Sequence, residues 1–367
     1  MISKNEINRI LSEYDLKKVK IGTICSHSAL QIFYGARQEK FETVGICKKD
    51  RKSVYEAFPL AKPNEFLFVE DFKEVLTQSL QDELRARNVV VVPHGSFVEY
   101  VGSEAIRNRF YVPMFGNRIT LEWESDRAKQ QIWLEKSGLK LPKTYQNPSE
   151  IDGKVFIKFP GAKGGKGFFT VNSEERYNIE LKKRIQKGLV RVEDASKTLI
   201  QEFIPGVRYY HHYFYSLFNN LGLKVDNGSL ELLSMDKRIE PIDESYRGAP
   251  DVPDEFYDYT VTGNQPVIVR ESLLPEVLRM GYNTVLSSIT LFPPGMLGAF
   301  SLETIYHPER GFTVFEVSAR IVAGTNLYPQ GSPYSAYLFK EPMSTGRRIA
   351  REIREAVKRN ALKHIIF

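Results

Sequence analysis

Two stretches near the C-terminal end decide the fold: GAFSLETIY at residues 298–306 and GFTVFEVSAR at residues 311–320. Both alternate apolar and polar residues as strands do, and the turn-rich segment HPERG separates them, which predicts a β-hairpin. If Glu303 pairs with Glu316 across it, both carboxylates point to one face. They would repel each other unless a divalent cation such as Mg²⁺ binds there. The hairpin therefore indicates an enzyme that uses metal-bound nucleotide phosphates. The alternative is an exposed hairpin with two solvated acids.

Composition sets limits on the class of protein. A chain of 367 residues is expected to form two or three subdomains, and 42% hydrophobic with 26% charged residues is ordinary for a globular protein. The net charge of +6 suits anionic ligands, but no dense basic tract interleaves with aromatic residues, so we expect no nucleic-acid partner. Apolar runs such as Val89–Val92 have strand length, so we expect no membrane span. With only two cysteines and no apolar signal segment, the predicted location is the cytoplasm.

The first third of the chain alternates strands and helices. Continuous apolar strands are predicted at residues 18–25, 43–47, 66–69 and 89–92, with helices between them. This order predicts an α/β domain with a parallel, doubly wound sheet, which we place at residues 1–124. Ligands of such sheets bind beyond the carboxyl ends of the strands. His27 and Ser96 both follow predicted strand ends, so they are candidate ligand-binding residues.

A glycine-rich loop follows in the middle of the chain. Residues 154–159 and 168–171 read as strands, and PGAKGGKG at residues 160–167 joins them. The order strand–loop–strand and the missing Lys-Ser/Thr ending argue against a Walker-type P-loop. Glycines admit phosphates close to the backbone, and lysines supply positive charge. The loop is therefore a candidate phosphate-binding segment, with a flexible basic hairpin tip as the alternative.

Taken in order, these features resemble the ATP-grasp superfamily. Lys158 lies on a strand before the glycine loop, a later strand ends in QEFIPG at residues 201–206, and the two glutamates come last. Many members carry Glu-x-Asn-x-Arg where this chain has EVSAR at residues 316–320, so Ser318 replaces one possible oxygen ligand. The resemblance implies an ATP-grasp domain, of α+β type in this part of the chain, at residues 125–367, with a lid subdomain at about 153–203.

The superfamily resemblance also implies roles for individual residues. Glu303 and Glu316 would hold Mg²⁺ or Mn²⁺, and Arg320 would act in catalysis on the transferring phosphate. One glutamate should meet the ATP ribose, with Glu231 and Glu240 both open as candidates. The remaining implied ATP-binding residues are Lys158, Gly164, Gly165, Lys166, Glu202, Phe203 and Ile204.

A closer resemblance rests on four further segments. ICSHSALQI (24–32), VPHGSFVEY (92–100), LELL (230–233) and SARIVAGTN (318–326) resemble the archaeal, formate-dependent 5-formaminoimidazole-4-carboxamide ribonucleotide (FAICAR) synthetase family over nearly the whole chain. The resemblance implies that the enzyme formylates 5-aminoimidazole-4-carboxamide ribonucleotide (AICAR) with ATP and formate, in purine biosynthesis. It also implies a homo-oligomer, and His27, Ser96 and Asn264 as AICAR-binding residues. The alternative for Asn264 is a turn asparagine.

Other interpretations stay open at this point. An ATP-grasp ligase could join a different acid to a different amine, and a paralogue could bind the nucleotide without catalysis. His211 and His212 suggest a metal site, but adjacent strand residues point to opposite faces, so we favour a structural role for both.

Overall fold

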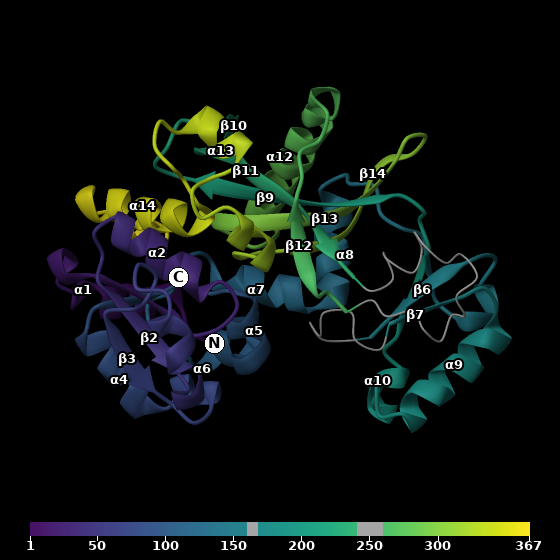
Figure 1. Cartoon of the computed structure of the whole chain (residues 1–367), viewed down its shortest axis with the longest axis horizontal. Coiled ribbons are helices and arrows are strands. Elements are labelled where there is room, and N and C mark those ends of the chain that lie inside the picture. The colour runs from purple at the N-terminus through teal and green to yellow at the C-terminus, as the bar shows by residue number, and fades with distance from the viewer. Residues whose placement is uncertain (160–167, 241–259) are drawn as a thin grey trace.

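The N-terminal part of the chain forms a four-stranded parallel sheet. A computed structural model describes residues 1–159, 168–240 and 260–367. The strand order is β3-β2-β1-β4, and every neighbouring pair is parallel, as the sequence predicts. The apolar strands β2, β1 and β4 are largely buried because helices cover both faces, whereas the edge strand β3 is partly exposed (Figure 1). The strands are β1 (Lys20–Ile24), β2 (Thr43–Cys47), β3 (Glu65–Phe68) and β4 (Val89–Val91); the helices are α1 (Lys4–Ser12), α2 (Ala29–Gln38), α3 (Lys52–Glu56), α4 (Gln78–Ala86), α5 (Gly95–Val101) and α6 (Ser103–Arg109).

The second sheet is larger and antiparallel. Its order is β10-β11-β9-β13-β14, and β12 pairs with β11. Buried apolar side chains on one face pack against α8 and α12. The strands are β9 (Val207–Ser216), β10 (Leu223–Val225), β11 (Gly228–Ile239), β12 (Gly263–Pro266), β13 (Gly298–His307) and β14 (Gly311–Ser318); the helices nearby in sequence or space are α7 (Arg118–Ser125), α8 (Arg127–Lys136), α12 (Leu274–Leu291) and α13 (Pro333–Leu338).

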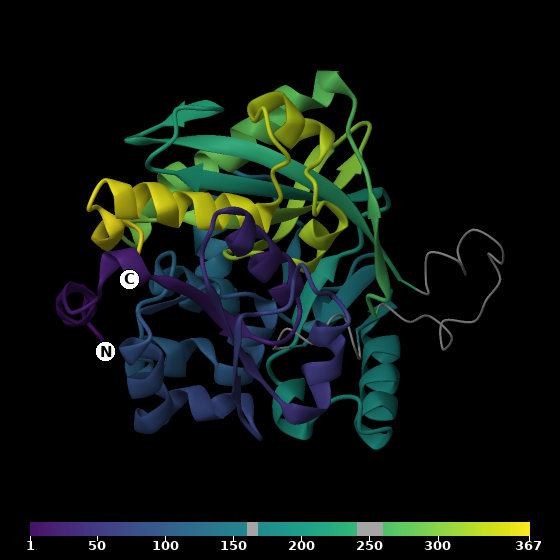
Figure 2. The same ribbon diagram turned by 60° about the vertical axis from the view of Figure 1, so that its left-hand side comes forward.

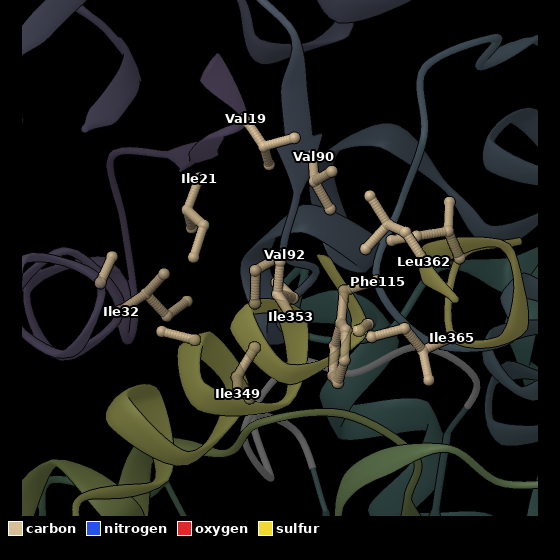
Figure 3. Close-up of a cluster of buried hydrophobic side chains, with 14 of the residues drawn as sticks. Val19, Ile21, Ile32, Val90, Val92, Phe115, Ile349, Ile353, Leu362 and Ile365 are labelled. Atoms are coloured by element: carbon tan, nitrogen blue, oxygen red, sulfur yellow. The ribbon is translucent and has the colours of Figure 1, made fainter. Parts of the chain in front are cut away.

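The last helix, α14 (Thr345–Lys358), lies between these two sheets (Figures 1 and 2). Its apolar residues Ile349 and Ile353 share a core with Ile21 and Val92 of the N-terminal domain (Figure 3). Glycines permit a close crossing with α2, because a Cβ on Gly346 would lie 2.3 Å from a backbone oxygen of that helix. The C-terminal helix therefore completes the N-terminal core, and the boundary at residue 124 remains a prediction.

A small third sheet has its own core and lies apart from the N-terminal domain (Figure 1). Its order is β5-β8-β6-β7, and all of its pairs are antiparallel. Its elements are β5 (Thr144–Tyr145), β6 (Val155–Lys158), β7 (Phe169–Val171), α9 (Glu174–Gln186), α10 (Val192–Ala195) and β8 (Leu199–Glu202). Among the described helices, none is both long and apolar enough to cross a membrane.

Candidate active site

One cavity of about 810 Å³ is lined by residues of the two antiparallel sheets and by segments that follow strands of the parallel sheet. Its walls come from the loops after β1 and β4, from β6 and the end of β8, and from the antiparallel sheet. Most of the site residues predicted from the sequence lie on these walls. They are His27, Ser96, Lys158, Glu202, Phe203, Ile204, Glu240, Asn264, Glu303, Glu316 and Arg320.

The glutamate hairpin forms as the sequence predicts, because Glu303 pairs with Glu316 across β13 and β14. The register shifts immediately beyond this pair, so a β-bulge lies beside the two carboxylates. Arg238 donates two hydrogen bonds to Glu303, at 2.7 and 3.1 Å, and Arg127 donates one to Glu316 at 3.2 Å. The repulsion expected between the carboxylates is therefore balanced here by two arginines.

Burial and these arginines act in opposite directions on the two carboxyl groups. Burial raises the pKa of Glu303, and the charge of Arg238 offsets only part of this effect. Burial also acts to raise the pKa of Glu316, but the charges of Arg127 and Lys158 outweigh it and hold that pKa below its usual value. Glu316 is consequently the more strongly ionised partner of the pair.

The oxygen ligands around the hairpin fit a hard divalent cation that is shared with a substrate. Ser318 donates to Glu303 at 3.2 Å, which adds a hydroxyl oxygen beside the carboxylates. The described residues contain no group of three or more His, Cys, Asp or Glu that could hold a metal ion by themselves. Mg²⁺ commonly binds through one or two carboxylates together with water and substrate phosphates. The donor set therefore fits such an ion better than a closed structural metal site.

Lys158 and the end of β8 form a neighbouring wall. Lys158 lies on β6, with its Nζ 4.7 Å from the centre of the Phe315 ring, and burial lowers its pKa to about 8. The side chain of Glu202 accepts from Arg310 at 3.1 Å. The backbone N–H of Phe203 donates to Lys154 at 3.0 Å, whereas the N–H of Ile204 donates to no backbone carbonyl among the described residues. Ile204 lines the cavity beside this strand end.

Arg320 connects the hairpin with the N-terminal domain. Its guanidinium forms an ion pair with Glu124 at 2.8 Å, while its buried Nε has no hydrogen-bond partner in the described part of the chain. A Cβ on Gly95 would lie 2.9 Å from Nε2 of His27 and 3.4 Å from Cζ of Arg320. Glycine at position 95 therefore lets the imidazole and the guanidinium approach each other.

His27 has an unusual backbone conformation for a residue other than glycine, with a φ of 50°. Such strain is concentrated at functional sites. Its Nδ1 lies 2.7 Å from the Ser28 hydroxyl, and its ring stacks on His94 with 5.3 Å between the centres. Desolvation by the surrounding protein, the His94 ring and the charge of Arg320 lower the pKa of His27 well below its usual value, although part of the side chain is exposed. The imidazole is thus neutral near pH 7.

Ser96 and Asn264 reach the cavity from different domains. Ser96 accepts a hydrogen bond from Ser26 at 3.2 Å, at the ends of two neighbouring parallel strands. Asn264 lies in β12, opposite Arg238, and donates to Asp236 at 2.7 Å. Asn264 is therefore a strand residue, and the alternative of a turn asparagine is wrong.

The two glutamates proposed for the ATP ribose lie in different places. Glu240 lines the cavity and forms an ion pair with Arg208. Glu231 is not among the lining residues, is 0% exposed and accepts two hydrogen bonds from Arg348, at 2.7 and 2.8 Å. The prediction that Glu231 could meet the ATP ribose is therefore wrong, because α14 covers this residue and Arg348 binds both of its carboxylate oxygens. Gly164, Gly165 and Lys166 lie outside the described residues.

The two histidines, which the sequence suggested to be structural, have separate partners within the sheet. His211 contacts the Thr304 hydroxyl at 3.0 Å, while His212 contacts Ser234 at 2.7 Å and Asp236 at 2.8 Å. The two rings lie on opposite faces of β9 and contact different partners. Neither residue belongs to a metal-binding group among the described residues.

Three arginines of the site were not predicted from the sequence: Arg127, Arg208 and Arg238. A signal for one of them was present, because the charged residues Asp236, Lys237 and Arg238 follow a largely apolar run near the end of β11. Charged residues at the end of a largely buried strand indicate a polar site there.

Comparison with known proteins places this geometry in a family. Models described as "Domain of unknown function (DUF1297)" and "Protein of unknown function (DUF1246)" match residues 176–367 and 21–145. A curated protein of Korarchaeum cryptofilum, named 5-formaminoimidazole-4-carboxamide-1-(beta)-D-ribofuranosyl 5'-monophosphate synthetase, is 53% identical over 100% of both chains. A similarly named synthetase 1 of Methanosarcina mazei is 50% identical over 100% of both chains.

A solved structure extends this similarity. The IMP biosynthesis protein PurP from Thermococcus kodakaraensis has a TM-score of 0.74 and 30% identity, and the match covers 95% of this chain and 100% of that one. Several more distant matches are ATP-grasp proteins that share the fold. The chain therefore belongs to the 5-formaminoimidazole-4-carboxamide ribonucleotide synthetase family and has the ATP-grasp fold.

Proposed function

We propose that this protein is an ATP-dependent ligase that formylates AICAR with formate and releases FAICAR, ADP and phosphate. The observation that carries the proposal is that the paired Glu303 and Glu316 share one cavity with His27 and Ser96. A metal–phosphate end and an acceptor end are thus lined by residues of different domains. Membership of the synthetase family supports this reaction.

At the metal–phosphate end, Glu303 and Glu316 would hold a divalent cation, Mg²⁺ or Mn²⁺. When bound, such an ion neutralises part of the phosphate charge. Lys158 supplies a further positive charge from β6. The Ile204 N–H would meet the adenine edge, and Glu240 would accept hydrogen bonds from the ribose hydroxyls. Arg208, Arg127 and Arg238 line the same region and add charge complementary to the triphosphate.

The reaction would proceed in two steps. A formate oxygen attacks the γ-phosphorus of ATP, ADP leaves, and formyl phosphate forms. The amine nitrogen of AICAR then attacks the formyl carbon, the bond from carbon to the phosphate oxygen breaks, and the nitrogen loses a proton. Arg320 would stabilise the developing phosphate charge, since its buried Nε has no partner in the described part of the chain. Neutral His27 and Asn264 would position the acceptor.

The decisive experiment combines the purified protein with Mg-ATP, AICAR and isotopically labelled formate, followed by mass spectrometry. We expect labelled FAICAR and one ADP for each FAICAR. An omission control without formate should release no ADP above background.

Two other outcomes would change the assignment. If labelled FAICAR is absent while another carboxylic acid supports ADP release, the ligase uses a different acyl donor. If AICAR binds without any ADP release, the protein is a nucleotide-binding paralogue without catalysis.

A further inference from the structure

A cluster of polar side chains surrounds Ser96 in the N-terminal part of the fold. It comprises Ser26, Arg51, Ser96 and Tyr100, and we call it the Arg51 cluster. Arg51 donates to the Ser26 hydroxyl at 3.1 Å, and Ser26 donates to the Ser96 hydroxyl at 3.2 Å. Ser96 and Tyr100 line the cavity. The cluster therefore borders the acceptor end of the active site.

Three neighbouring parallel strands bring the cluster together. Ser26 follows β1, Arg51 follows β2, and Ser96 follows β4, in a sheet where β1 lies between the other two. The carboxyl ends of parallel strands are where ligands of such sheets bind. The topology thus places these residues at the expected ligand-binding edge.

Within the described part of the chain, the charge of Arg51 has no carboxylate counter-ion. Its guanidinium donates to the Ser26 hydroxyl and, at 3.5 Å, to the Cys25 carbonyl, and it also bonds with Tyr100. By contrast, Arg127, Arg208, Arg238 and Arg320, which line the cavity, are each paired with a glutamate, whereas Arg51 lies behind the lining residues Ser96 and Tyr100. A half-buried arginine beside two hydroxyls, without a carboxylate partner, is suited to bind an anion.

Phe72 holds the charged and phenolic members in place. The Arg51 guanidinium lies 5.4 Å from the centre of the Phe72 ring, and the Tyr100 ring stacks on it at 5.2 Å. Burial acts to raise the pKa of Tyr100, but hydrogen bonds with Arg51 and Ser26 outweigh it and lower that pKa. The acidic groups nearby, Asp50 and Glu99, are exposed. Their charges are consequently screened by solvent.

We propose that the Arg51 cluster binds the phosphate monoester of the ribonucleotide substrate, and that Arg51 makes the enzyme prefer the ribonucleotide to its nucleoside. This inference rests on the proposed function. Binding at the Arg51 cluster would also orient AICAR. Its phosphate would lie at Arg51, and its amine would lie toward His27 and Arg320. Planar arginine and hydroxyl donors match the three oxygens of a phosphate group.

The test measures binding by calorimetry without ATP or formate, so it does not depend on turnover. The ligands are AICAR, its dephosphorylated nucleoside and ribose 5-phosphate. The variants are Arg51→Met, which removes the charge but keeps much of the stem, and Arg51→Lys, which keeps a charge. Arg37→Met is the matched control, because Arg37 is an exposed arginine of the same domain that also donates to backbone carbonyls.

We expect Arg51→Met to weaken AICAR and ribose 5-phosphate binding by about 10- to 100-fold, as for the loss of a hydrogen bond to a charged group. Nucleoside binding should change by less than about twofold, Arg51→Lys should restore part of the loss, and Arg37→Met should behave as wild type. Equal weakening of nucleotide and nucleoside, or no weakening of either, would overturn the inference.

The inference and the proposed function can fail separately. If Arg51-dependent AICAR binding is found but no FAICAR forms, only the proposed function fails. If FAICAR forms normally while phosphate recognition is independent of Arg51, only the inference fails.

Discussion

Two clusters of ion pairs lie on the same face of the antiparallel sheet. One is buried in the protein, and the other is open to the cavity. In one, Glu231 binds Arg348, which also binds Glu352 at 2.9 Å, and these side chains are at most 2% exposed. In the other, Glu303 binds Arg238, whose side chain is 24% exposed and lines the cavity. The residue types and the distances are alike, so pairing by itself does not distinguish a structural from a functional site.

What differs is the element that covers each cluster. Helix α14 lies over the first cluster and supplies Arg348 and Glu352. The second cluster opens into the cavity, where a ligand can reach its charges. A covered pair stabilises the folded chain, whereas an open pair can exchange its partners for those of a substrate. The following substitutions test this contrast, beginning with the largest expected effect.

Glu231→Ala should lower the free energy of unfolding by about 3–5 kcal/mol, because it leaves the buried charge of Arg348 without one partner. Urea denaturation measures this effect. The KM for ATP should stay within about twofold of wild type. An unchanged stability with a large rise in this KM would instead place Glu231 at the nucleotide.

Glu316→Ala should reduce kcat for formate-dependent ADP release by about 10²- to 10³-fold, and Glu303→Ala should do likewise, as expected for loss of electrostatic stabilisation. The matched control is Glu309→Ala, because Glu309 is an exposed acid of the same hairpin. Normal turnover of either variant at ordinary Mg²⁺ concentration would remove the metal assignment.

Glu240→Gln should raise the KM for ATP about tenfold and leave kcat within about twofold, because a uniform binding contact is weakened. Steady-state kinetics with varied ATP measure this. Equal KM values for the variant and wild type would contradict the proposed contact between Glu240 and the ATP ribose.

The affinity for ATP should also depend on pH through Lys158. Burial lowers the pKa of this lysine to about 8. The charged form binds phosphate, so affinity is retained below this pKa and falls as the pH rises through it. If only the charged form binds, the association constant for ATP should decrease about fourfold between pH 7 and 8.5. Calorimetry measures the change, and Lys158→Arg, which stays charged, should abolish it.

The sequence predicted those features that depend on local periodicity. Alternation in the hairpin indicated that Glu303 faces Glu316, and continuous apolar runs indicated the parallel sheet; the structure confirms both. The position of His27 and Ser96 after strand ends likewise indicated the edge where the cavity lies. Each inference needs only the geometry of one strand or of neighbouring strands.

The choice between Glu231 and Glu240 could not be made in this way. Simple alternation along one strand puts residues 231 and 240 on opposite faces, but the register shift between Leu232 and Ser234 brings them to one face. Only α14, more than a hundred residues later in the chain, then covers Glu231 and leaves Glu240 at the cavity.

The sequence by itself thus determined the strands, their likeness to an ATP-grasp family and the acidic residues that face each other across a hairpin. The tertiary structure alone decided which charges are covered, which arginines balance the carboxylates, and that Arg51 has no carboxylate partner among the described residues. The physical reason is the separation along the chain between the residues that determine each feature. Backbone periodicity is a property of adjacent residues, whereas burial and ion pairing depend on segments that meet only after folding.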